Sequence, residues 1–167
     1  MLVLILVLWD VSKIPTNRPE ELIWSGWSLY KYNIEKLLFI SSSVVYPDIE
    51  NDSMIENQSM LDNPPNIYFP VGWMKRYSEL LAKTYSENIK DGFKSIIIRP
   101  SNIYGPYDNF DPKESHVIPS LIRRIVNKET PFEIWGDGKE ERDLLFISDL
   151  INFVDLAIKK QKNTLDD

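Results

Sequence analysis

The sequence predicts an α/β layered fold built around a parallel β-sheet. Several short segments are apolar at every position, which is typical of strands buried on both faces of a parallel sheet. Between them lie segments with apolar residues at every third or fourth position, the spacing of a helix with one buried face. The 167 residues, 43% of them hydrophobic, are enough for one domain with a core of ordinary size.

Three segments are predicted strands. Residues 1–9 (MLVLILVLW) form one apolar run, residues 36–41 (KLLFIS) a second, and residues 95–99 (SIIIR) a third that Pro100 closes. A membrane-spanning helix needs about 20 apolar residues, so the first run is too short to cross a bilayer. We therefore expect no membrane partner, and a membrane-associating segment at the N-terminus is the alternative.

Two longer segments are predicted helices, each with one apolar face. In residues 72–89 this face consists of Trp73, Tyr77, Leu80, Leu81, Tyr85 and Ile89. In residues 117–126 it consists of Val117, Ile118, Leu121, Ile122 and Ile125. Both segments are thus predicted to be amphipathic helices of an α/β layered fold.

The remaining elements are shorter or irregular. Residues 132–135 and 144–147 are predicted strands. Ser148 is expected to cap a last helix with Asp149 in its first turn, where the helix dipole favours a negative charge. Residues 10–31 are expected to form a loop plus a helix, and residues 48–66, rich in Asn, Asp, Ser and Pro, a long surface loop.

Charge and composition exclude several classes of function. The 19 Lys and Arg against 25 Asp and Glu give a net charge of −6, which argues against broad binding to nucleic acid because such binding needs a basic face. The chain has no Cys and one His, His116, so thiolate and multi-histidine metal sites are excluded and no metal is expected. The lack of Cys fits a reducing compartment, so we expect a cytoplasmic protein.

Four polar clusters stand out along the chain. They are SSSVVYP at 41–47, VGWMKR at 71–76, RPSNIYGP at 99–106, and WGDG at 135–138 followed by Arg142-Asp143. Two of them follow predicted strands, and in open α/β sheets ligands bind beyond the carboxyl ends of the strands. Taken singly, the serines have a structural alternative as the end of a strand, and Lys75 has one as a solvated side chain.

Together and in this order, the clusters resemble the motifs of the extended short-chain dehydrogenase/reductase superfamily, the NAD-dependent epimerases and dehydratases. Within it, residues 102–124 (NIYGPYDNFDPKESHVIPSLIRR) most resemble the GDP-L-fucose synthases. The resemblance implies a Rossmann-type parallel sheet with flanking helices. It also implies hydride transfer between NADP or NAD and a nucleotide-linked keto-sugar.

The resemblance assigns roles to residues at matching positions. Ser42 matches the hydroxyl that hydrogen-bonds the reacting oxygen of the sugar. Lys75 matches the lysine that holds the nicotinamide ribose and lowers the pKa of a catalytic Tyr. Pro100 and Asn102 match a segment beside the nicotinamide. Family enzymes often pair through helices, including the one that carries this lysine, so the resemblance also allows a homodimer.

Substrate contacts carry over in the same way. Ser43, Arg124, Trp135 and Arg142 match positions that hold a nucleotide-diphosphate sugar. The planar fork of Arg142 suits a diphosphate because it can bond two oxygens at once. His116 matches one member of the acid/base pair that fucose synthases use for epimerisation. The alternatives are core packing for Trp135 and a satisfied structural histidine for His116.

The sequence departs from the family pattern at three places. The catalytic Tyr is expected four residues before Lys75, but Val71 stands there, and a missing general acid costs about 10²- to 10⁴-fold in rate. Val44 stands where the Cys that partners the histidine is expected, which affects two-base epimerisation more than simple 4-keto reduction. No glycines form the G-x-x-G-x-x-G turn that approaches the cofactor pyrophosphate.

We therefore expect a single partial epimerase/dehydratase domain. About residues 1–105 would form the rest of a Rossmann sheet, and about residues 106–167 the start of the substrate-binding portion. The N-terminal cofactor-binding unit and the C-terminal part of the substrate domain are expected to be missing. The predicted function is an NAD(P)-dependent nucleotide-sugar epimerase/reductase, inactive as this isolated chain. The alternative is a non-catalytic pseudoenzyme or gene fragment that binds a nucleotide-sugar or a partner chain.

Overall fold

A computed structural model describes residues 3–7, 34–48, 55–88, 93–134, 136–139 and 141–160, with the backbone alone for residues 3–7. The loop and helix predicted at residues 10–31 lie outside the described residues. The chain divides into two compact units. One consists of Met1–Pro100 with Leu156–Asp167, and the other of Ser101–Asp155.

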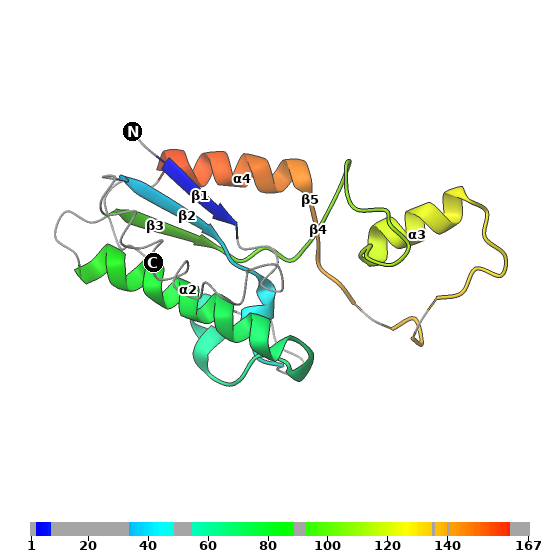
Figure 1. Cartoon of the computed structure of the whole chain (residues 1–167), viewed down its shortest axis with the longest axis horizontal. Helices are drawn as coiled ribbons and strands as arrows, with labels where there is room; N and C mark the ends of the chain where they lie inside the picture. The colour runs from blue at the N-terminus through cyan, green and yellow to red at the C-terminus, as the bar shows by residue number, and fades with distance from the viewer. Residues whose placement is uncertain are drawn as a thin grey trace, which may run out of the picture. The chain divides into compact units, whose positions relative to one another are not determined.

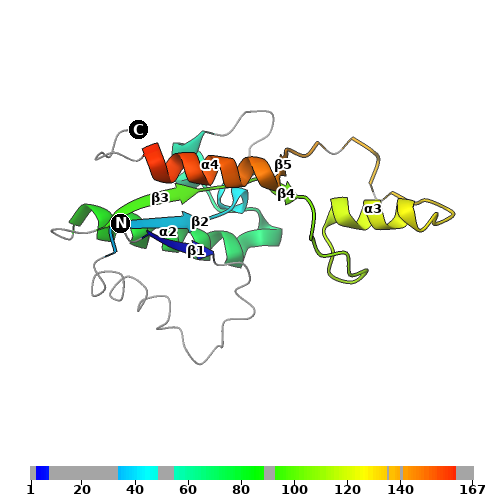
Figure 2. The same cartoon turned by 90° about the horizontal axis from the view of Figure 1, so that it is seen from above.

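The first unit contains a parallel sheet of three strands in the order β1-β2-β3 (Figures 1 and 2). Its strands are β1 (Val3–Val7), β2 (Lys36–Ile40) and β3 (Lys94–Ile98). Leu38 in the central strand pairs with Ile5 on one side and with Ile96 on the other. The predicted parallel sheet and its three apolar strands are therefore confirmed.

Both faces of strand β2 are buried. Leu37, Leu38 and Phe39 are consecutive, so their side chains point alternately to the two faces, yet none is more than 3% exposed. Ala82 and Phe93 join Leu37 in a buried cluster. Because both faces are covered, the buried middle of the strand is apolar at consecutive positions.

Helix α2 (Phe69–Asn88) runs along one face of the sheet (Figures 1 and 2). The helix predicted at residues 72–89 is confirmed in its described part, but the prediction of its buried face is wrong. Trp73, Tyr77 and Leu80 are 42%, 47% and 55% exposed. The opposite face is buried and carries Gly72, Lys75, Arg76, Ser78, Glu79 and Ala82. Apolar spacing indicated the wrong face because the charged groups of the buried face are hydrogen-bonded within the fold.

The second unit pairs β4 (Asn102–Tyr104) in parallel with β5 (Leu144–Phe146). It also contains α3 (Val117–Val126), as predicted. Helix α4 (Ile147–Lys160) begins directly after β5, with Asp149 in its first turn. The expectation that Ser148 caps this helix is wrong, because the helix has already begun at Ile147. The end of α4 belongs to the first unit, where Lys36 Nζ donates to the carbonyl of Ile158 at 2.6 Å.

Other predictions for loops and faces need correction. Residues 132–134 form no strand, and the carbonyl of Glu133 accepts a hydrogen bond from an α3 side chain instead of from a neighbouring strand. The expected loop at residues 48–66 contains a 3₁₀ turn, η3 (Glu56–Met60). Three residues of the expected apolar face of α3 are 46% to 62% exposed: Val117, Ile122 and Ile125. Within the described residues, no helix combines the length and the apolar character needed to cross a membrane.

Gly72 brings the first turns of α2 close to two other segments. A Cβ atom at this position would lie 2.5 Å from Cβ of Pro64 and 2.8 Å from the carbonyl oxygen of Val44. Val44 belongs to η2 (Ser43–Val45), the 3₁₀ turn that follows β2. Both separations are shorter than van der Waals contact, so the close approach of helix and turn requires glycine.

We expect Gly72→Ala to lower the free energy of unfolding by about 1–3 kcal/mol through overpacking, although alanine in a helix is otherwise favoured over glycine by about 1 kcal/mol. Urea unfolding measures this change. The matched control is Thr84→Ala on the exposed part of the same helix, which should change the free energy by less than about 0.5 kcal/mol. Equal stability of the wild type and Gly72→Ala would contradict the close approach of α2 to η2.

Candidate active site

The segment that follows β2 is held at the carboxyl edge of the sheet. The amide of Ser41 donates to the carbonyl of Ile98 at 2.7 Å, and the amide of Ser43 donates to the carbonyl of Pro100 at 3.1 Å. The pairing of β2 with β3 thus continues past the last residues of both strands. Ser43 and Pro100, both predicted site residues, are therefore neighbours at this edge.

Ser42 lies in the same segment and caps the turn η2. Its Oγ accepts a hydrogen bond from the amide of Val44 at 3.4 Å, and its side chain is half-buried. A serine hydroxyl has one hydrogen and two lone pairs. Because the contact with Val44 uses a lone pair, the hydroxyl hydrogen can still be donated to a bound oxygen.

Lys75 reaches the same strand end from α2. Its side chain is buried, and Nζ donates to the carbonyl of Ile40 at 2.9 Å, two residues before Ser42. Nζ also lies 5.3 Å from the centre of the Phe39 ring. Burial lowers the pKa of Lys75, and the charge of Glu79 one turn further along the helix partly opposes this. The structure thus brings Ser42 and Lys75 to one edge of the sheet.

Val71 lies one helical turn before Lys75, with its side chain 39% exposed. Two tyrosines are near in sequence. Tyr68 ends the 3₁₀ turn η4 (Asn66–Tyr68) before α2 begins, and Tyr77 follows Lys75 on the helix with 47% exposure. Neither has the one-turn spacing before Lys75, so the position of the expected general acid is occupied by a valine.

A buried ion pair beside Lys75 was not predicted as part of the site. Arg99 follows β3, and its Nε and NH2 donate to the two carboxylate oxygens of Glu79 at 3.0 and 2.7 Å. Its NH1 donates to Tyr46 Oη at 3.1 Å and to the carbonyl of Glu56 at 2.7 Å. Burial alone would lower the pKa of Arg99, but the hydrogen bonds with Glu79 and Tyr46 outweigh it and raise this pKa.

Arg76 is a second buried cation that the sequence left without a role. It is 1% exposed, its Nε donates to the carbonyl of Val45 at 2.8 Å, and its guanidinium lies 5.0 Å from the centre of the Trp73 ring. Its bond to Val45 ties η2 to α2. The one sequence signal for this network was the spacing of Lys75 and Glu79, which puts a cation and a carboxylate on one helix face.

The other predicted residues belong to the second unit. Asn102 Nδ2 donates to the carbonyl of Asp143 at 3.0 Å, which fastens the beginning of β4 to the segment before β5. His116 is exposed and precedes α3, and its carbonyl accepts from the amide of Ser120. Arg142 is exposed, and Trp135 lies outside the described residues.

Arg124 on α3 is held from three sides. Its Nε donates to Glu129 Oε2 at 2.8 Å, and its NH1 donates to the carbonyl of Glu133 at 2.6 Å. Its guanidinium lies 4.8 Å from the centre of the Phe132 ring. Arg123 NH1 donates to the other oxygen of Glu129 at 3.2 Å. The predicted residues are thus divided, with Ser42, Ser43, Lys75 and Pro100 in the first unit and Asn102, His116, Arg124 and Arg142 in the second.

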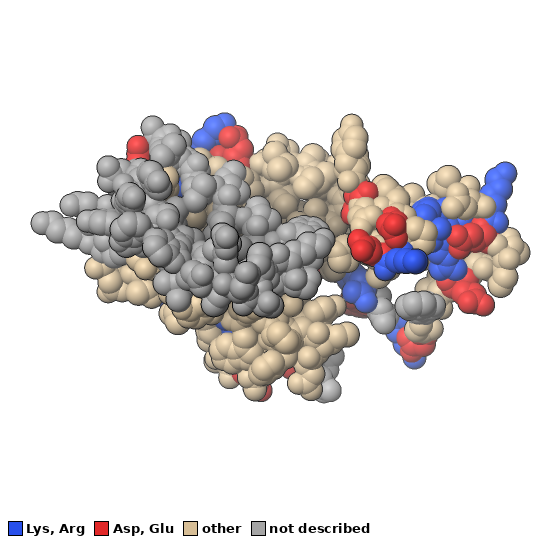
Figure 3. Space-filling view, viewed as in Figure 1, with Lys and Arg blue, Asp and Glu red and all other residues tan. Residues whose placement is uncertain are grey.

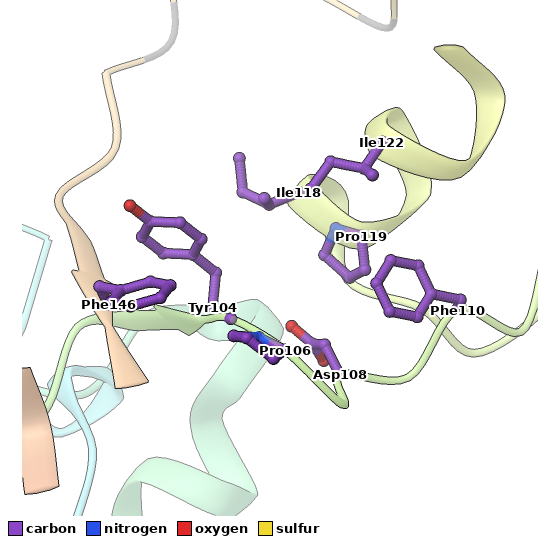
Figure 4. A pocket seen from close by; sticks show the side chains of 9 residues that line it. Tyr104, Pro106, Asp108, Phe110, Ile118, Pro119, Ile122 and Phe146 are labelled. Atoms are coloured by element: carbon purple, nitrogen blue, oxygen red, sulfur yellow. The ribbon is translucent and has the colours of Figure 1, made fainter. Parts of the chain in front are cut away.

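The second unit also contains an apolar cavity of about 280 Å³ (Figure 4). Residues of α3 line one side, Tyr104 and Phe146 line another, and Asp108 and Phe110 come from the loop between β4 and α3. The lining contains three aromatic rings and one carboxylate. Among the predicted site residues that the structure describes, none contributes to this lining.

We expect Arg99→Met to lower the free energy of unfolding by about 3–5 kcal/mol, because it leaves the buried carboxylate of Glu79 without its partner. Urea unfolding measures the loss, and the double variant Arg99→Met/Glu79→Met should recover part of it by removing that charge. Lys83→Met is the control, because the exposed pair of Lys83 with Glu87 should contribute less than about 1 kcal/mol. A loss no larger than that of the control would contradict the buried pair.

The lowered pKa of Lys75 predicts how stability changes with pH. Between this pKa and the ordinary value of 10.5, the unfolded chain binds more protons at this residue than the folded protein does. The free energy of unfolding of the wild type should therefore rise relative to that of Lys75→Met as the pH increases toward 10.5. Unfolding curves of the two proteins at several pH values test this. A difference that falls with pH would refute it.

Residues 27–166 match the model of the NAD dependent epimerase/dehydratase family. The chain is 36% identical over 129 residues to probable GDP-L-fucose synthase 1 of Oryza sativa subsp. japonica, covering 73% of this chain and 38% of the relative. It is 30% identical over 125 residues to the GDP-L-fucose synthase of Escherichia coli (strain K12), covering 72% of this chain and 38% of the relative. The chain thus spans about two fifths of the length of these curated relatives.

Solved structures show the same fold. A GDP-L-fucose synthetase from Naegleria fowleri matches with a TM-score of 0.79 at 21% identity, covering 93% of this chain and 51% of that one. The UDP-N-acetylglucosamine 4-epimerase from Methanobrevibacter ruminantium M1, solved with UDP-N-acetylmuramic acid, matches with a TM-score of 0.77 at 26% identity, covering 97% and 53%. These matches confirm the predicted Rossmann-type α/β class. The family model and the relatives also confirm the resemblance drawn from the four motifs, and the chain belongs to the NAD-dependent epimerase/dehydratase family.

Proposed function

We propose that the protein is an NAD(P)-dependent nucleotide-sugar epimerase/reductase of the GDP-L-fucose synthase type, inactive as this isolated chain. The observation that carries the proposal is the hydrogen bond from Lys75 Nζ to the carbonyl of Ile40, two residues before Ser42. It puts a buried cation and a serine hydroxyl at one carboxyl edge of the sheet, the edge at which open α/β folds bind ligands. The identity to GDP-L-fucose synthases over more than 120 residues supports the same substrate class.

The residues at this edge fit the nicotinamide end of NADP or NAD. Lys75 is a buried cation that can hold ribose hydroxyls, and the hydroxyl oxygen of Ser41 is buried without a hydrogen-bond partner among the described residues. Lys75 and Pro100 at this edge would hold the cofactor, and Asn102 is proposed as a further contact from its position in the family motif. When bound, the nicotinamide would supply or accept the hydride.

Ser42 is proposed to orient the substrate. With its oxygen accepting from the Val44 amide, its hydroxyl hydrogen would be donated to the keto oxygen of the sugar, where negative charge develops on reduction. Ser43, Arg124, Trp135 and Arg142 are the proposed contacts to the nucleotide-diphosphate sugar. The Val44 side chain cannot act as an acid or base, so it cannot be the second member of an acid/base pair with His116. Reduction of a 4-keto group therefore fits these residues better than two-base epimerisation.

Val71 favours a second candidate function, a non-catalytic member of the family that binds a nucleotide-sugar without turning it over. A valine cannot donate the proton that the product alcohol requires, and the loss of a general acid costs about 10²- to 10⁴-fold in rate. Both candidate functions require the protein to bind a nucleotide-sugar, but only the reductase converts it to product. One set of variants therefore tests both.

Restoring the hydroxyl with Val71→Tyr in an otherwise complete enzyme should increase the rate of NADPH oxidation in the presence of a GDP-linked 4-keto-sugar by about 10²-fold or more. The new phenol would lie one helical turn from the Lys75 ammonium, which favours phenolate and so eases proton exchange. Val71→Phe is the matched control, because it adds the ring without the hydroxyl and should stay at the wild-type rate. If Val71→Tyr binds the sugar nucleotide but gains no rate, the reductase proposal fails and the non-catalytic function stands.

A further inference from the structure

One carboxylate in the second unit holds two arginines. Glu129 Oε2 accepts from Arg124 Nε at 2.8 Å, and Glu129 Oε1 accepts from Arg123 NH1 at 3.2 Å. Two positive charges and one negative charge leave this cluster with a net charge of +1. On the face drawn in Figure 3, the basic side chains around α3 lie among acidic ones, in keeping with such local pairing.

The guanidinium of Arg124 is also held in place without Glu129. The Phe132 ring lies against it, with 4.8 Å from the guanidinium carbon to the ring centre, and the carbonyl of Glu133 accepts from NH1 at 2.6 Å. A planar guanidinium fixed in this way is suited to bind two oxygens of a phosphate side by side. The oxygens of Glu129 occupy part of the donor set that a phosphate would use.

The carboxylate of Glu129 is placed where a bound anion can displace it from the two arginines. It lies in the turn after α3, following Lys128, whose φ of 53° is in the left-handed region, and its side chain is 36% exposed. The two arginine side chains are 24% and 20% exposed, so this ion pair is only partly buried and costs less to break than the buried pair of Glu79 with Arg99. A diphosphate carries more negative charge than one carboxylate and can form hydrogen bonds with both arginines, so it should displace the carboxylate of Glu129.

We propose that Glu129 is an internal competitor for anions at the Arg123–Arg124 pair, and that an incoming diphosphate displaces its carboxylate. This inference rests on the proposed function, in which Arg124 contacts the diphosphate of a sugar nucleotide. Glu129 thereby acts as a specificity-determining residue. It excludes anions that bind no better than a carboxylate and admits the diphosphate group.

Calorimetric titration of the full chain with inorganic pyrophosphate and with GDP tests the proposal. Glu129→Gln should bind pyrophosphate about threefold to tenfold more tightly than the wild type, because the competing charge is gone. Glu133→Gln is the matched control. It removes one negative charge four residues away but keeps the backbone carbonyl that contacts Arg124, so its affinity should stay within about twofold of the wild type. Glu129→Asp keeps the charge and should also remain near the wild-type value.

Unchanged or weaker pyrophosphate binding by Glu129→Gln overturns the proposal, as does an equal gain in Glu133→Gln. Loss of all pyrophosphate binding in Glu129→Gln overturns it too, since that outcome would make Glu129 a positioning residue for Arg124. A gain for pyrophosphate without any GDP binding supports the competitor and contradicts the proposed nucleotide-sugar function. GDP binding that Glu129→Gln leaves unchanged supports that function and contradicts the competitor. Thermal unfolding of each variant shows that the affinities refer to folded protein.

Discussion

The ion pair of Glu79 with Arg99 makes the rest of the first unit possible. Helix α2 packs its charged face inward, and a buried charge is tolerated only when it is paired and hydrogen-bonded. Arg99 satisfies both carboxylate oxygens of Glu79 and also bonds Tyr46 and the carbonyl of Glu56. One guanidinium therefore connects the end of β3, the segment after η2, the turn η3 and the middle of α2.

The position of the candidate active site follows from this packing. With the charged face of α2 against the sheet, Lys75 reaches the carbonyl that ends β2, and Gly72 allows the helix to touch the 3₁₀ turn that Ser42 caps. Val71 lies on the same helix one turn earlier and remains exposed. The scaffold that holds a serine and a lysine together is thus present, while the side chain expected to transfer the proton is replaced by an inert one.

The ion pair of Glu129 in the second unit has a different role, because its carboxylate is partly exposed to solvent. The two arginines of α3 share Glu129, whose side chain is far more exposed than that of Glu79, 36% against 4%. A partly exposed pair costs less to break than a buried one. An arginine–glutamate ion pair therefore stabilises the fold of the first unit, whereas in the second unit such a pair forms an anion contact that a ligand can replace.

The sequence by itself determined the elements and the motifs. Continuous apolar runs predicted the parallel strands, helical spacing predicted α2 and α3, and the order of four motifs pointed to Ser42 and Lys75. Tertiary structure decided which face of α2 is buried. Apolar periodicity takes account only of hydrophobic residues, and it gives no information on the ion pair between Glu79 and Arg99, which lies twenty residues further along the chain. Tertiary structure also decided that residues 132–134 form no strand, since a strand exists only when another strand pairs with it, whereas here the carbonyl of Glu133 bonds Arg124. Local patterns follow from local sequence, while the pairing of charges and strands depends on segments that only the folded chain brings together.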